Sequence, residues 1–64
     1  MNDSAIPITL YLTDAQAWAL AQFLKRAGFD DYRRLAVDED EAYAMRDAGE
    51  KVRAHLGLAG YAPR

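Results

Sequence analysis

The sequence lacks cysteine, and it has only two prolines, one tryptophan and one histidine in 64 residues. Without cysteine the chain forms neither a disulfide nor a thiolate metal site. No stretch approaches the roughly 18 consecutive apolar residues that a membrane-spanning helix needs. The N-terminal sequence MNDSAIPITL also lacks the basic residues that open a secretion signal. These absences favour a cytoplasmic protein without a membrane segment.

The composition that remains is typical of one small folded domain. Hydrophobic residues make up 52% of the chain and charged residues 28%, with a net charge of -2, whereas disordered acidic tails contain few hydrophobic residues. We therefore treat residues 1–64 as a single domain. A domain of this length buries only about 60% of the surface of its unfolded chain, so association with a partner or a second copy would add stability.

Residues 6–12 show the two-residue period of a half-buried β-strand. Apolar and other side chains alternate through Ile6, Pro7, Ile8, Thr9, Leu10, Tyr11 and Leu12. An isolated strand leaves its backbone groups unpaired. The strand is therefore expected to pair with the C-terminal tail, with a second copy of the chain or with a partner, so that the protein is a monomer or a strand-joined homodimer.

A first helix is predicted after this strand. Thr13 and Gln16 have the spacing of a capping box, and Gly28 is expected to end the helix in the left-handed conformation. Lys25 and Arg26 in the last turn suit the negative end of the helix dipole. The face toward the core is predicted to contain Ala17, Leu20, Phe23, Leu24 and Ala27.

A short helical piece, DDYRRLA over residues 30–36, follows. Asp30 or Asp31 is expected to cap its start. Tyr32 and Leu35 are expected to point inward.

The last and longest helix is predicted from near Glu39 to near Leu56. Its core stripe is expected to contain Ala42, Met45, Ala48, Gly49, Val52 and Leu56. Because Ala48 and Gly49 are small, the first helix is expected to cross at that point. The predicted fold class is therefore mainly α with one N-terminal β-strand, a small α+β domain in the order strand, helix, short helix, long helix.

Four consecutive carboxylates, Asp38, Glu39, Asp40 and Glu41, precede or open this last helix. In one interpretation they form an ordinary helix start. Asp38 would be the cap and Glu41 its capping-box partner. The helix dipole favours negative charge in the first turn by about 0.3 to 1 kcal/mol per residue.

The acidic run also lacks local counter-charges, which a helix start alone does not explain. No basic residue lies three or four positions after any of these four acids, whereas Asp30 and Asp31 have Arg33 and Arg34 nearby and Asp47 has Lys51. Residues 30–41 contain six acidic residues and two arginines, a local charge of -4. A concentrated acidic patch of this kind favours a basic partner surface.

The chemistry of that partner follows from the charge spacing. A helix rises about 1.5 Å per residue, and duplex DNA carries one charge per about 1.7 Å of axis, so consecutive carboxylates imitate phosphate density. Trp18 and Tyr43 are expected to serve as aromatic anchors beside the acidic residues. Alternatively, a neighbouring loop covers Trp18. Tyr61 is expected to be a packing residue. The predicted partner-binding residues are Trp18, Asp30, Asp31, Asp38, Glu39, Asp40, Glu41, Tyr43 and Asp47.

Other functional classes find less support. His55 has no companion ligand at a spacing of three or four, and no nucleophile or glycine-rich phosphate loop accompanies the acids, so no catalytic residue, metal or cofactor is predicted. The order strand, helix, helix is that of a ribbon-helix-helix DNA-binding regulator. Its outward positions would be Thr9 and Tyr11, and no basic residue precedes Lys25. Direct nucleic-acid binding is therefore disfavoured, while a small structural oligomerisation module stays open.

The chain from ITLYLTDAQAWALAQFLKRAGFDDYR through VDEDEAYAMRDAGEKVRAHLGLAGYAPR resembles very small proteins of phages and bacterial mobile elements. In particular it resembles anti-CRISPR proteins that act against type I-C systems. The resemblance is one of overall pattern and transfers no site residue. It implies a non-enzymatic inhibitor in the host bacterial cytoplasm, which binds a subunit of the Cascade surveillance complex and prevents target DNA from entering. The acidic surface would act there as a DNA mimic.

Overall fold

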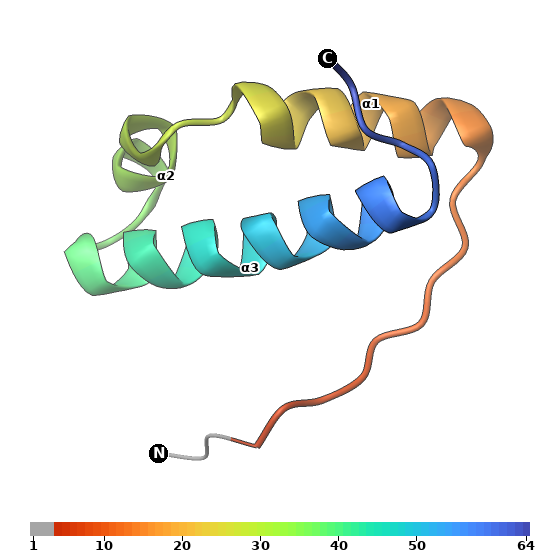
Figure 1. Ribbon diagram of the computed structural model, residues 1–64. Helices are drawn as coiled ribbons and strands as arrows, with labels where there is room; N and C mark the ends of the chain where they lie inside the picture. The colour runs from red at the N-terminus through yellow and green to blue at the C-terminus, as the bar shows by residue number, and fades with distance from the viewer. Residues whose placement is uncertain (1–3) are drawn as a thin grey trace.

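The computed structural model describes residues 4–64, which form three α-helices (Figure 1). They are α1 (Asp14–Arg26), α2 (Phe29–Leu35) and α3 (Glu39–Leu58). Helices α1 and α3 lie side by side and antiparallel, and the short α2 lies beside the start of α3 (Figure 1). Residues 4–64 contain no β-strand, so the domain is all-α.

The predicted strand over residues 6–12 is therefore wrong, and with it the small α+β fold class. Residues 4–13 form an extended N-terminal arm, which leaves the start of α1 and runs below α3 in the view of Figure 1. A strand needs a neighbour with free backbone groups. Within residues 4–64 the arm has none, because the remainder of the chain is helical or docks elsewhere. The alternation of apolar residues is present in the sequence, but residues 4–64 contain no second strand with which this segment could form a sheet.

Helix α1 begins as predicted. The Gln16 amide donates to Thr13 Oγ1 at 3.1 Å, and the Thr13 amide donates to Gln16 Oε1 at 2.9 Å, which completes the capping box. Lys25 and Arg26 occupy the last turn. Each end of α1 is thus stabilised by residues that the sequence identifies.

The junction between α1 and α2 differs from the prediction. Gly28 is not left-handed: its φ is -101° and it is the N-cap of α2. The Gly28 amide donates to Asp31 Oδ2 at 2.8 Å. Helix α2 therefore starts at Phe29, so neither Asp30 nor Asp31 is the N-cap. The next helix begins almost at once, which requires an extended residue rather than a left-handed one.

The core is thin and rich in alanine. Its cluster of buried residues consists of Ala17, Ala21, Leu24 and Leu56, with Leu20 and Tyr61 packed against it, and Ala42 is also fully buried. Several side chains predicted to face inward are exposed instead: Phe23, Leu35, Ala48 and Val52. Helix α1 turns its small Ala21 toward α3 in place of Phe23, because a close approach between helices needs small side chains at the contact.

Gly49 lies where side chains of α1 and α2 pack against α3. A Cβ atom at this position would lie 2.6 Å from the Tyr32 hydroxyl and 3.4 Å from Leu24 Cδ2. Gly49 therefore admits side chains from α1 and α2 against α3. The crossing predicted near Ala48 and Gly49 is confirmed for Gly49, whereas Ala48 lies on the exposed side of α3.

The C-terminal tail returns to α1 after α3 ends. Gly60 has a φ of +101°, in the region that side chains rarely adopt. The Tyr61 amide donates to the Leu56 carbonyl at 2.8 Å across this turn. The reversal brings Tyr61 onto α1, where it covers part of the core.

We expect the substitution Gly49→Ala to lower the melting temperature. Alanine is favoured over glycine in a helix by about 1 kcal/mol, but the new methyl group would displace Tyr32 from its place against α3. In a Tyr32→Phe background the nearest obstructing atom is gone, so Gly49→Ala should there be neutral or stabilising. Thermal unfolding of the four proteins tests this. A stabilisation of equal size in both backgrounds would show that Tyr32 does not limit the site.

Candidate functional site

The acidic run lies at the start of α3, where two of its carboxylates have structural roles. The Glu41 amide donates to Asp38 Oδ1 at 2.8 Å, so Asp38 is the predicted cap. The Glu41 carboxylate accepts from the Val37 amide at 2.8 Å, one residue before the predicted partner. Glu39 and Asp40 take part in neither hydrogen bond and are exposed. Half of the run therefore builds the helix start and half is left for other contacts.

The ion pairs within residues 4–64 do not involve the four carboxylates of the acidic run. Their shortest distances are 3.4 Å for Arg34 with Asp31, 3.2 Å for Arg46 with Asp47 and 3.8 Å for Arg53 with Glu50. No lysine or arginine of the described chain pairs with Asp38, Glu39, Asp40 or Glu41. We call the first three of these, Asp38, Glu39 and Asp40, the acidic end of α3. Within the described residues, the helix dipole offsets its charge and no ion pair does.

The acids of α2 lie close to this end of α3. The Phe29 and Tyr43 rings have centroids 4.7 Å apart, so the start of α2 packs beside the second turn of α3. Asp31 is already engaged, since it accepts from the Gly28 amide and pairs with Arg34. Asp30 is exposed. The fold thus gathers acids from two helices and neutralises one of them.

Tyr43 is held between Phe29 and Arg46, two contacts that the sequence analysis does not predict. Phe29 packs against its ring, and the Arg46 guanidinium lies 5.0 Å from the ring centroid. The Tyr43 side chain remains 43% exposed, one turn after Glu39. The spacing of three residues from Tyr43 to Arg46 was a usable signal for this contact.

Asp47, another predicted contact residue, pairs with Arg46 at 3.2 Å and not with Lys51 as expected. Glu50, one turn further on, pairs with Arg53. The middle of α3 therefore carries acids whose charge is locally offset. The uncompensated charge is confined to the start of the helix.

Trp18 lies apart from the acidic end. Its ring meets Tyr61 edge-on, with centroids 5.1 Å apart, and the Tyr61 hydroxyl donates to Asp14 Oδ1 at 2.6 Å. The C-terminal tail thus covers Trp18 in part and leaves it 40% exposed. The alternative interpretation of Trp18, as a residue covered by a neighbouring segment, holds only in part, because two fifths of the side chain stays exposed. Tyr61 is confirmed as a packing residue.

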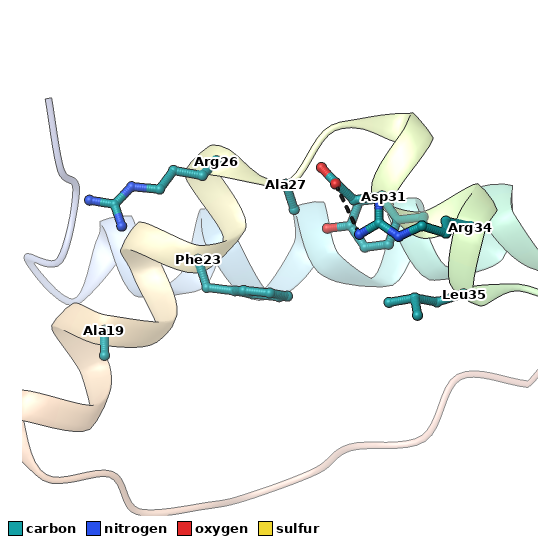
Figure 2. Close-up of a pocket in the computed structure, with 8 residues that line it drawn as sticks. Ala19, Phe23, Arg26, Ala27, Asp31, Arg34 and Leu35 are labelled. Carbon is teal, nitrogen blue, oxygen red and sulfur yellow. Dashed lines mark hydrogen bonds and ion pairs between the residues drawn. The ribbon is translucent and has the colours of Figure 1, made fainter.

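A shallow hollow of about 410 Å³ separates the end of α1 from α2 (Figure 2). Phe23 and Leu35 lie on the same side of it, and the ion pair between Asp31 and Arg34 stands at its edge (Figure 2). These exposed apolar side chains were predicted to be core residues. The hollow holds an apolar surface with one ion pair and no histidine, serine or threonine among its lining residues.

His55 is exposed near the end of α3 and donates from Nδ1 to the Lys51 carbonyl at 3.0 Å. In the described part of the chain, no three histidine, aspartate or glutamate side chains are grouped so that they could hold a metal ion. None of the helices in residues 4–64 is both long and apolar enough to cross a membrane.

The pKa of Tyr61 is raised above its ordinary value of 10.0, first by the hydrogen bond that its hydroxyl donates to Asp14, then by desolvation and by repulsion from the Asp14 charge. Because the pKa of Tyr61 is higher in the folded than in the unfolded protein, its protonated hydroxyl stabilises the fold fully below pH 10. This stabilisation is lost as the pH rises through the pKa of Tyr61 in the folded protein. We expect Tyr61→Phe to melt at a lower temperature than the wild type at neutral pH.

The difference in melting temperature between the wild type and Tyr61→Phe should shrink above pH 10. There the Tyr61 hydroxyl of the wild type ionises and its hydrogen bond to Asp14 is lost, whereas phenylalanine has no group that ionises. Thermal unfolding of both proteins across this range measures it. A difference that stays constant with pH would show that the bond to Asp14 does not stabilise the fold.

A family of unknown function (DUF7706) matches residues 1–64, the whole length of the chain. No match was found among the curated proteins or among the solved structures.

Proposed function

We propose that this chain, which belongs to the DUF7706 family, is a non-enzymatic inhibitor that binds a basic protein surface through the acidic end of α3. The observation that carries the proposal is the exposure of Glu39 and Asp40 without a basic partner in the described chain. Unpaired surface charge raises the association rate with a complementary surface and disfavours wrong partners. The acidic end of α3 is therefore suited to a positively charged groove.

The proposed groove is one that normally receives DNA. Successive residues of α3 advance about 1.5 Å, close to the charge spacing of about 1.7 Å along a duplex. The resemblance of the sequence to type I-C anti-CRISPR proteins names the partner: a DNA-binding subunit of Cascade in the host bacterial cytoplasm. The inhibitor would occupy the channel and keep target DNA out.

Tyr43 is the proposed aromatic anchor of this contact. It stands one turn after Glu39 on α3, and its ring is positioned by Phe29 and Arg46. Tyrosine is enriched among residues that dominate binding energy. A side chain already held in place loses little conformational freedom on binding. Charge would thus guide the encounter and Tyr43 would add shape-specific contact.

The double substitution Glu39→Lys and Asp40→Lys tests the proposal, because both side chains are exposed and neither makes the capping hydrogen bonds. We expect the affinity for type I-C Cascade to fall about tenfold or more, as attraction becomes repulsion. The measurement is titration of purified Cascade, with circular dichroism to verify that helix content is retained.

The matched control is Asp47→Lys with Glu50→Lys, which changes the net charge equally on the same helix. These acids are already paired with Arg46 and Arg53, so the loss of affinity should be smaller. Wild-type affinity of the Glu39→Lys, Asp40→Lys protein would refute the acidic surface as the binding site.

Co-purification with Cascade, followed by a target-DNA binding assay, tests the partner itself. We expect the wild-type protein to remain with the complex and to prevent DNA binding. The protein alone should not retard a labelled duplex. Retardation of the duplex, combined with no retention by Cascade, would favour a DNA-binding regulator and overturn the inhibitor.

A further inference from the structure

The N-terminal arm exposes apolar side chains that have no cover in the described chain. Ile6, Ile8 and Leu10 are exposed by 76%, 74% and 60%. The arm, residues 4–13, contains no charged residue. Residues 5–12 also make no backbone hydrogen bond to another part of residues 4–64. Both the apolar side chains and the backbone of residues 5–12 are therefore available to a second molecule.

The solvent-accessible surface of the chain is larger than that of a compact monomer of the same mass. The chain exposes 5409 Å², whereas a compact monomer of its 7.2 kDa exposes about 4,100 Å². Its radius of gyration is 12.8 Å, against roughly 11 Å for a compact chain of this length. The excess of about 1,300 Å² exceeds the roughly 800 Å² that each partner buries in a standard interface. One standard protein–protein interface would account for more than half of this excess.

A hollow beside the arm shows where a second chain would lie. The arm and α3 enclose an open space of about 870 Å³. The arm contributes Ile6, Ile8 and Leu10 to its wall, and α3 contributes residues that include Val52 and Leu56. Val52 is itself exposed. A second extended segment laid along the arm would cover apolar side chains on both.

The uncharged arm allows a second copy to be the occupant despite the net charge of the chain. Two copies of a chain with a net charge of -2 repel each other, most strongly through their acidic ends of α3. The arms carry no charge, so they can meet without that repulsion. An uncharged, alternating segment is also complementary to itself, as an isologous two-fold interface requires.

We propose that the arms of two copies pair antiparallel across a two-fold axis at Thr9. In this register Ile8 of each copy stands opposite Leu10 of the other, and Ile6 opposite Leu12, so all four apolar positions face an apolar residue. Pro7 has no N–H and must point its nitrogen away from the second arm. Thr9 lies two residues after Pro7, so its backbone N–H and C=O also point away from the second arm. The two Thr9 residues therefore form a non-hydrogen-bonded pair.

A single introduced cysteine tests this register, because the protein has no cysteine of its own. Non-hydrogen-bonded antiparallel pairs have Cα atoms about 4.5 Å apart, within the usual disulfide range of about 4.4 to 6.8 Å. We expect Thr9→Cys to form a disulfide-linked dimer under mild oxidation.

The matched control is Tyr11→Cys, on the same side of the arm. Its two copies would be offset by four residues, about 14 Å along the strand direction, so little cross-linking is expected. Equal cross-linking of both variants, or none by Thr9→Cys, would overturn the register.

Sedimentation equilibrium tests the assembly independently of cysteine chemistry. We expect a mass of twice 7.2 kDa for the wild type. The substitution Ile8→Asp should give the monomer mass with unchanged helix content, since Ile8 is exposed in the single chain. A monomeric wild type at about 100 μM, or an unchanged dimer in the Ile8→Asp variant, would overturn the proposal. Glu39→Lys with Asp40→Lys should leave the dimer intact, which separates this inference from the proposed function.

Discussion

The three helices approach one another through small side chains, and this packing limits how much apolar surface the fold buries. Ala17, Ala21 and Ala42 are buried where larger residues could have packed, and Gly49 leaves room for Tyr32 and Leu24. Alanine buries little apolar surface, so each such contact contributes little to stability. The helices are held close, but the core remains small for the length of the chain.

That constraint also determines what lies on the surface. With alanine at the helix contacts, the larger apolar side chains remain outside: Ile6, Ile8, Leu10, Phe23, Leu35 and Val52 are exposed. These residues occur on the arm, on all three helices and around two separate hollows. A chain of this size gains further burial only through contacts with another molecule.

The acidic run combines a folding role with the proposed binding role. Asp38 and Glu41 satisfy backbone amides before and within the first turn of α3. The helix dipole makes negative charge tolerable there, so Glu39 and Asp40 need no counter-ion from the chain. Further along α3 the acids are paired with arginine. The start of the helix is thus where unpaired charge is least costly to the fold and most available to a basic surface.

Local signals in the sequence predicted local structure. Thr13 with Gln16 and Asp38 with the following acids placed two helix starts correctly, because a cap needs only residues within one turn. Two predictions that depended on distant partners failed. The period of residues 6–12 predicts a strand only if a neighbour is present, and helical periodicity did not distinguish the Phe23 side of α1 from the Ala21 side.

The candidate site shows the same division. The acids could be read from the sequence, and so could the absence of basic residues three or four positions later. The pairing of Asp47 with Arg46 and the packing of Phe29 on Tyr43 could not, since the first depends on a side-chain conformation and the second on how α2 docks.

Amide hydrogen exchange of the protein, free and bound to type I-C Cascade, tests whether the acidic end of α3 is the binding surface. We expect binding to slow exchange most at the start of α3, around Glu39 to Tyr43. Slowed exchange confined to α1 around Trp18 or to the end of α3, with no change at its start, would contradict it.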